Sequence, residues 1–150
     1  MKKIVFVLMS VILLSGCSID NESGPNVAYD LVAITGNDLP ESFEKGKTYE
    51  VNVTYELPNQ CYAFNSLDAR RAGSSSEQRR KIYVGAISLV NLSGTCDESS
   101  EGDTGTSKFT ILIDEDGEYE FNFWIGKDST GQSLYDKVTV PVVDNTNTGA

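Results

Sequence analysis

The residues of this chain that could carry out chemistry are carboxylates, serines, arginines and three cysteines, because its 150 residues include no histidine. Histidine is the commonest general base and the commonest metal ligand. No serine stands in a Gly-x-Ser-x-Gly sequence. Carboxylates are paired at Asp114/Asp116 and at Glu118/Glu120, and alternation along a strand directs Glu118 and Glu120 toward solvent. We therefore expect no enzyme and no cofactor.

Two acidic segments are candidates for a cation site. Calcium needs several oxygen ligands that converge at about 2.3–2.6 Å, and neither segment has the Asp-x-Asp-x-Asp-Gly spacing of a calcium loop. We expect solvated acidic loops and no metal site. The candidate ligands are Asp97, Glu98, Glu101 and Asp103 in "DESSEGDTG", and Asp114 and Asp116 in "DEDG".

The N-terminus has the pattern of an export signal. Lys2 and Lys3 precede an apolar run of eleven residues, Ile4 to Leu14, and the small Ser15 and Gly16 follow it. The run is too short to span a bilayer as a helix, which takes roughly 20 residues. A positive region, a short apolar region and small residues indicate a signal peptide with a cleavage site.

Leu14-Ser15-Gly16-Cys17 resembles the lipobox of bacterial lipoproteins. The resemblance implies cleavage before Cys17 and acylation of its thiol and new amino group. Several acyl chains hold a protein on a membrane firmly, since each buried CH₂ contributes about 0.8 kcal/mol. The expected organisation is a signal peptide (1–16), a lipid-anchored tether (17–26), one folded domain (27–144) and a disordered tail (145–150).

Loss of the signal peptide makes the chain more acidic. Removing Lys2 and Lys3 reduces the 12 basic residues to 10 against 22 acidic ones, so the formal net charge becomes −12. Such a chain repels nucleic acid. Asp20 and Glu22 loosely resemble an acidic signal that sends some Bacteroidota lipoproteins to the outer face of the outer membrane. A solvated linker explains them equally, so we expect the outer membrane and leave its face open.

Cys61 and Cys96 remain in the mature chain. An exported chain meets an oxidising compartment, where an even number of cysteines favours pairing. We expect a disulfide that closes a loop of about 35 residues. Two separate buried thiols are the alternative.

The mature chain is patterned for strands. In "TYEVNVTYEL" apolar and polar residues alternate, which places the apolar set on one face. The same pattern in "KFTILI", "EYEFNFWI" and "DKVTVPVV" directs Ile125, among others, inward, and Pro141 marks an edge or a bulge. Weaker strands are expected at 27–34, 61–64 and 82–92. About seven strands separated by Gly, Asn and Asp turns predict an all-β antiparallel sandwich.

The segment "EDGEYEF" resembles the tyrosine corner of immunoglobulin domains, with Gly117 at the turn and Tyr119 as the corner tyrosine. Phe121 replaces the usual second cysteine, so any disulfide departs from the antibody pattern. Two longer stretches, 39–65 and 117–142, resemble an uncharacterised group of small Bacteroidota lipoproteins. The resemblance implies an immunoglobulin-like sandwich and carries no activity.

Basic residues cluster around "AGSSSEQ" in this acidic chain. They form a positive lobe that could dock an anionic glycan, a headgroup or an acidic partner. They could equally neutralise the acidic loop 97–103, and we favour a solvated, mobile loop. The cluster comprises Arg70, Arg71, Arg79, Arg80 and Lys81.

Aromatic residues offer a second candidate site. Trp124 falls on the polar face of its strand, and Tyr62 and Phe64 follow Cys61. An exposed aromatic ring stacks on a sugar or anchors a protein contact. The alternative for Trp124 is a second packing layer beneath a loop. "DST" at 128–130 also resembles an O-glycosylation acceptor of Bacteroidota.

These observations favour a cell-envelope lipoprotein that binds or adheres to protein or glycan. We expect the chain to associate with the membrane itself through lipid on Cys17. A structural accessory subunit of an envelope complex is the main alternative, and a small hydrolase is a weaker one.

Overall fold

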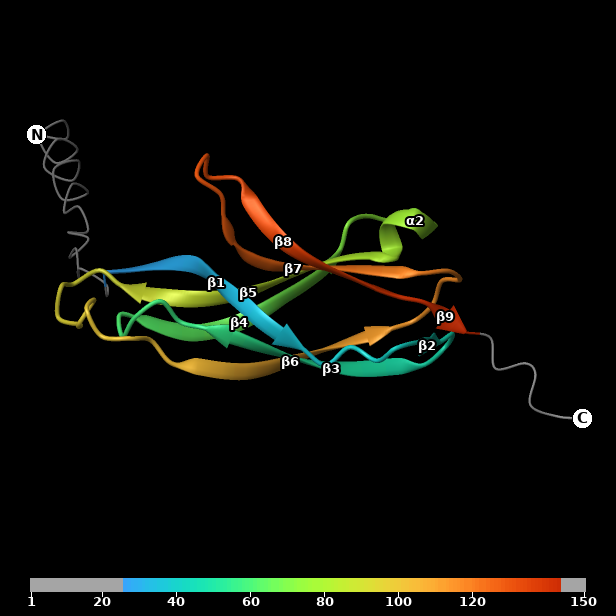
Figure 1. Cartoon of the computed structure of the whole chain (residues 1–150), viewed down its shortest axis with the longest axis horizontal. Coiled ribbons are helices and arrows are strands. Elements are labelled where there is room, and N and C mark those ends of the chain that lie inside the picture. Colours follow the sequence, from blue (N-terminus) through green and yellow to red (C-terminus); the bar gives the residue numbers. More distant parts are fainter. Residues whose placement is uncertain (1–25, 144–150) are drawn as a thin grey trace, which may run out of the picture.

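The structure is a computed structural model that describes residues 26–143. The expected signal peptide, Cys17, nearly all of the tether and the tail lie outside the described residues. Nine strands and one short helix make up the described chain (Figure 1). They are β1 (Val27–Asn37), β2 (Phe43–Glu44), β3 (Thr48–Glu56), β4 (Tyr62–Arg71), α2 (Ser76–Arg79), β5 (Lys81–Asn91), β6 (Thr104–Leu112), β7 (Tyr119–Lys127), β8 (Ser133–Val140) and β9 (Val142–Val143).

The prediction of an all-β fold is confirmed. Seven strands form one open, mostly antiparallel sheet in the order β6-β3-β1-β5-β7-β8, with β4 on the other edge of β5. Two pairings are parallel, β5 with β7 and β2 with β9. These two pairings are exceptions to the antiparallel arrangement that we expected, which the other pairings follow.

β1 joins the two layers of the sandwich because it belongs to both. Its first part, Val27–Val32, pairs with β5, and its second part, from Ala33 onward, pairs with β3. β7 takes over beside β5 where β1 leaves, pairing with residues Lys81–Val84. The core lies between the β3–β6 layer and the β5–β7 layer, and its fully buried members include Val32, Phe43, Val51, Val84, Ile113, Tyr119 and Phe121.

Alternation along the strands was predicted correctly for β3 but fails at the end of β7. Tyr119, Phe121 and Phe123 point into the core, as expected. The β7–β8 register then shifts between Trp124 and Gly126, which leaves Ile125 as the extra residue. Ile125 is exposed rather than inward, because a bulge resets which side the next residue faces.

Pro141 ends β8 as the sequence indicated. β8 is an edge strand of the large sheet, and proline cannot donate a hydrogen bond to a ladder. The Pro141 carbonyl accepts the Phe43 N–H at 2.8 Å, and the chain continues as β9 beside β2. The beginning of β1 and the strand β9 lie at opposite ends of the long axis (Figure 1).

The expected disulfide is present. Cys61 and Cys96 are bonded, with their Cα atoms 5.2 Å apart and 35 positions apart in the sequence. The bridge fastens the irregular segment between β5 and β6 to the start of β4. It therefore stabilises the end of the domain at which the described chain begins.

We predict that the double substitution Cys61→Ser/Cys96→Ser lowers the free energy of unfolding by about 3–4 kcal/mol, because an open chain of this loop length gains entropy when it unfolds. Urea denaturation of the oxidised wild type and the variant measures the difference. Reducing agent should destabilise the wild type to a similar degree and leave the variant unchanged. Equal stability of the two proteins contradicts the prediction.

Candidate functional site

The basic segment begins with a well-formed turn. Ser75 caps α2, since its hydroxyl accepts the Gln78 N–H at 3.3 Å while the Gln78 side chain reaches back to the Ser75 N–H. This capping box fixes the entry to the helix. Arg79, in the last turn of α2, is thereby held beside β4 and the β6–β7 connection.

Arg71 and Arg79 are bound by the protein itself. Arg71 Nη1 lies 2.8 Å from Asp114 Oδ1 and also donates to the Arg79 carbonyl, while its Nη2 donates to the Leu112 carbonyl at 2.6 Å. Arg79 pairs with Asp114 through Nη2 and with Glu115 through Nε at 2.9 Å. These side chains are half-buried, and their donors point at the β6–β7 corner.

Tyr119 completes this corner. Its hydroxyl accepts the N–H groups of Asp114 at 3.1 Å and Glu115 at 3.0 Å, and it donates to the Asp114 carboxylate at 3.3 Å. A hydrogen bond from a buried tyrosine to upstream backbone is what a tyrosine corner makes. Burial raises the pKa of Asp114, but the hydrogen bonds from Arg79 and Arg71 outweigh it and lower that pKa overall.

The prediction of a mobile basic lobe is therefore wrong for Arg71 and Arg79. They neutralise carboxylates of the protein, as the alternative supposed, but those carboxylates belong to 114–115 and not to the loop 97–103. Arg70 differs, since its side chain is 75% exposed and lies 3.2 Å from Asp68.

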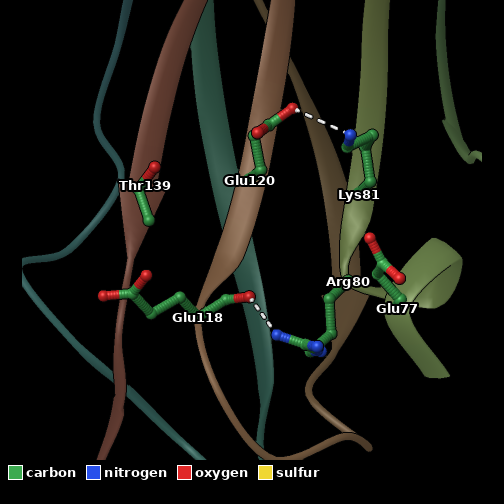
Figure 2. Close-up of a pocket in the computed structure, with 6 residues that line it drawn as sticks. All are labelled: Glu77, Arg80, Lys81, Glu118, Glu120 and Thr139. Carbon is green, nitrogen blue, oxygen red and sulfur yellow. Dashed lines mark hydrogen bonds and ion pairs between the residues drawn. The ribbon is translucent and has the colours of Figure 1, made fainter.

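Arg80 lines a charged pocket of about 300 Å³ together with Lys81, Glu118 and Glu120 (Figure 2). Its Nη1 donates to the Glu118 carbonyl at 3.1 Å, and its Nε is buried without a hydrogen-bond partner. Lys81 lies 3.7 Å from Glu120. The pKa of Glu120 is lowered chiefly by the Asn122 amide, and also by Lys137 and Lys81. The pocket is thus nearly balanced in charge.

The outer face is the side of the β4–β5–β7–β8 layer, with the first part of β1, that points away from the core. Ile82, Val84 and Ala86 of β5 point inward, so the alternate residues of β5 point outward. From Tyr83 to Leu89 these outward residues are apolar or glycine, as are their neighbours Tyr29 and Leu31 on β1. The apolar side chains of the outer face are Tyr29, Leu31, Tyr83, Ile87, Leu89 and Tyr135, and all of them are at least partly exposed.

The opposite exterior is polar apart from Leu112, which is 48% exposed at the end of β6. On the outside of the β3–β6 layer, Glu50 pairs with Thr110, Asn52 with Lys108, and Thr54 with Thr106. We call this surface the polar exterior. An antiparallel sheet that faces water on one side carries polar residues across that side, as the polar exterior does. The outer face instead carries a row of apolar side chains, with charged residues such as Asp68, Arg70 and Lys137 beside it.

Trp124 lies on the outer face as a packed ring, as the alternative supposed, and not as an exposed platform, although it packs against tyrosines rather than beneath a loop. Its side chain is only 7% exposed, and its Nε1 donates to Ser133 Oγ at 3.2 Å. Tyr135 is opposite Trp124 on β8 and packs edge-on against Tyr83, with ring centroids 5.4 Å apart. Trp124 therefore supports the exposed tyrosines, and the hollow that they share with Leu31 measures about 50 Å³.

Tyr62 and Phe64 do not join this surface. Phe64 stacks on Tyr55 with centroids 4.3 Å apart, on the core side of β4. The Tyr62 hydroxyl lies 3.5 Å from Asp30 Oδ2. The structure thus brings Arg70 and Trp124 together around the hollow and separates them from Tyr62, Phe64, Arg71 and Arg79.

The acidic loop 97–103 is organised by its own hydrogen bonds. The hydroxyls of Ser100 and Ser99 donate to the Asp97 carboxylate at 2.5 and 2.6 Å and lower the pKa of Asp97 to about 2. Within residues 26–143, no group of three or more carboxylates and thiols is placed to hold a metal ion.

Sequence reasoning missed Tyr83, Tyr135 and Leu31. A signal was available in "KIYVGAISLV", where both alternating sets of residues are apolar. Such a run is typical of a strand that is covered on both faces.

Comparison with known proteins identifies the N-terminus alone. Residues 1–18 match the family model described as prokaryotic membrane lipoprotein lipid attachment site. No curated protein and no solved structure matches the chain. The chain is accordingly a prokaryotic lipoprotein, anchored to a membrane of the cell envelope. In the part that the structure describes, no helix is long and apolar enough to cross a membrane.

We predict that Asp114→Asn lowers the free energy of unfolding by about 1–3 kcal/mol at pH 7, because it removes the charge that Arg71 and Arg79 share. Asp116→Asn, in an exposed pair with Lys45, should cost less than about 1 kcal/mol. Because the folded pKa of Asp114 is lowered, the wild-type advantage is present above the usual Asp value of 3.8 and fades below it. Urea titrations from pH 7 to pH 3 test this, and equal losses in both variants contradict it.

The attachment site yields a second prediction. Cys17→Ala should release the chain from membranes while leaving the β domain folded, since the thiol that accepts the lipid is lost. Ultracentrifugation of cell envelopes followed by circular dichroism of the released protein measures both effects. A variant that stays in the membrane pellet contradicts the lipid-anchor assignment.

Proposed function

We propose that this lipoprotein is a non-catalytic binding module of the cell envelope, and that its outer face is the binding surface. One observation carries the proposal: the outer face is apolar where the polar exterior of the same domain is polar. Tyr29 is 71% exposed and Tyr135 is 38% exposed on this face. Contiguous apolar surface on a soluble domain marks an interaction site.

The composition of the outer face resembles that of a protein-binding surface. Tyr83 and Tyr135 pack against each other on this face, with Trp124 beside them in the same hollow. Charged side chains such as Arg70 and Lys137 surround the apolar residues. An apolar centre with aromatic anchors and a polar rim is the usual anatomy of protein interfaces.

A protein is favoured over a glycan as the ligand. Small-molecule pockets commonly measure about 300–1,000 Å³. The hollow at Tyr83 and Tyr135 measures about 50 Å³, which does not enclose a sugar ring. The charged pocket is large enough, but no aromatic ring lines it. A structural subunit of an envelope complex, our second candidate, would use the same outer face.

The immunoglobulin-like relationship and the outer membrane are part of the proposal. The hydrogen bonds of Tyr119 support the first, although the parallel β5–β7 pairing departs from immunoglobulin sheets. The acidic residues Asp20 and Glu22 support the second. Protease shaving of intact cells distinguishes a surface-exposed domain from a periplasmic one.

We predict that Tyr135→Arg weakens partner binding by about 2 kcal/mol, or about thirtyfold, as expected for an aromatic anchor at the centre of an interface. Thr106→Arg, on the polar exterior, is the matched control and should bind normally. Pulldowns with the tagged mature lipoprotein from detergent-solubilised envelopes compare the two variants with wild type.

Loss of binding in both variants, or in neither, argues against the outer face as the binding surface. A glycan array with the same proteins forms a second arm. Glycan binding that Tyr135→Arg abolishes would replace the protein ligand by a carbohydrate at the same face.

A further inference from the structure

We infer that the outer face binds a second copy of this chain, so that two anchored lipoproteins pair side by side on one membrane. The inference rests on the proposed function and names the partner of the same surface. Three features of the described domain support it: the extent of the apolar row, the charge of the outer face and the position of the tether.

The apolar row extends along the strands instead of filling a pocket. Leu31 lies opposite Ile87, and Tyr29 lies opposite Leu89, in the β1–β5 register. Tyr83 continues the row toward the opposite end of β5. An elongated apolar surface on a sheet is covered well by another sheet, since two sheets pack face to face at about 10 Å.

The outer face carries little net charge although the mature chain is strongly acidic. Arg70 has Asp68 at 3.2 Å, and Lys81 and Lys137 share Glu120 at 3.7 and 4.0 Å, so three cations stand beside two carboxylates. An identical face therefore meets little charge of like sign there. The remaining acidic surface is screened beyond about 8 Å at physiological salt.

The tether selects the symmetry of the pair. The strands run along the long axis of the domain, and β1, which follows the tether, begins at one end of it (Figure 1). A two-fold axis parallel to the strands keeps the beginnings of both β1 strands at the same end, so both tethers reach the same membrane. A perpendicular axis sends them to opposite ends. The parallel axis also stacks the outer faces as one isologous interface.

Anchoring lowers the affinity that such a pair needs. Two lipoproteins confined to one membrane meet at a high effective concentration, so a modest interface is sufficient. With the axis between β5 and β7, the residues closest to their own copies belong to β5. Tyr83 and Ile87 are these residues, and both are partly exposed.

Cysteine cross-linking in membranes tests the inference. Full-length chains that carry Tyr83→Cys or Ile87→Cys are produced in the native cell with two different epitope tags, and envelopes are treated with a bis-maleimide. Cys61 and Cys96 do not react because they are bonded to each other. Thr106→Cys, exposed on the polar exterior, is the matched control.

The expected result is an adduct of twice the chain mass, containing both tags, that forms several-fold more with either outer-face cysteine than with Thr106→Cys. Adding Tyr135→Arg should reduce it. Equal adducts from all positions indicate random collisions and overturn the inference. An adduct with a different protein overturns the inference but supports the proposed function. Absence of any adduct from both outer-face positions overturns the inference, whereas the pulldowns with Tyr135→Arg decide the proposed function separately.

Discussion

Asp114 is the group on which the corner of this fold depends. Its carboxylate receives Arg71 from β4 and Arg79 from α2, and its backbone N–H donates to the Tyr119 hydroxyl at the start of β7. Segments far apart in the sequence thus meet at one half-buried charge. Because the arginines also bond to backbone carbonyls, the corner holds the β4–β5 connection against the β6–β7 connection.

The corner fixes the start of β7, and the side chains of β7 contribute both to the core and to the outer face. Tyr119 and Phe121 fill the core, while Trp124 turns outward beneath Tyr83 and Tyr135. The central β5 is consequently apolar on both sides, although a second layer covers only its inner side. A domain that is tethered by lipid and apolar on one exterior is suited to lateral contacts at a membrane.

Local chemistry decided which predictions were right. Three predictions were correct: the alternation in β3, the end of β8 at Pro141 and the disulfide. The first two depend on neighbouring residues, and the third depends on the even number of cysteines in the mature chain. The environment of Arg71 and Arg79 was not predicted correctly, because their carboxylate partners are more than thirty positions away in the sequence. For Trp124 the packed alternative holds and the exposed platform does not, because its ring lies beside Tyr83 and Tyr135 and its Nε1 donates to the Ser133 hydroxyl on the neighbouring strand.

The sequence by itself determined the lipid attachment at Cys17, the all-β character and the existence of an even cysteine pair. These follow from short-range patterns and from the compartment that a signal peptide implies. Only the tertiary structure decided that β5 pairs in parallel with β7, that the arginines serve the β6–β7 corner, and that one exterior is apolar. Those features depend on which strands become neighbours, and strand neighbours are chosen by the packing of the whole core, not by any one segment.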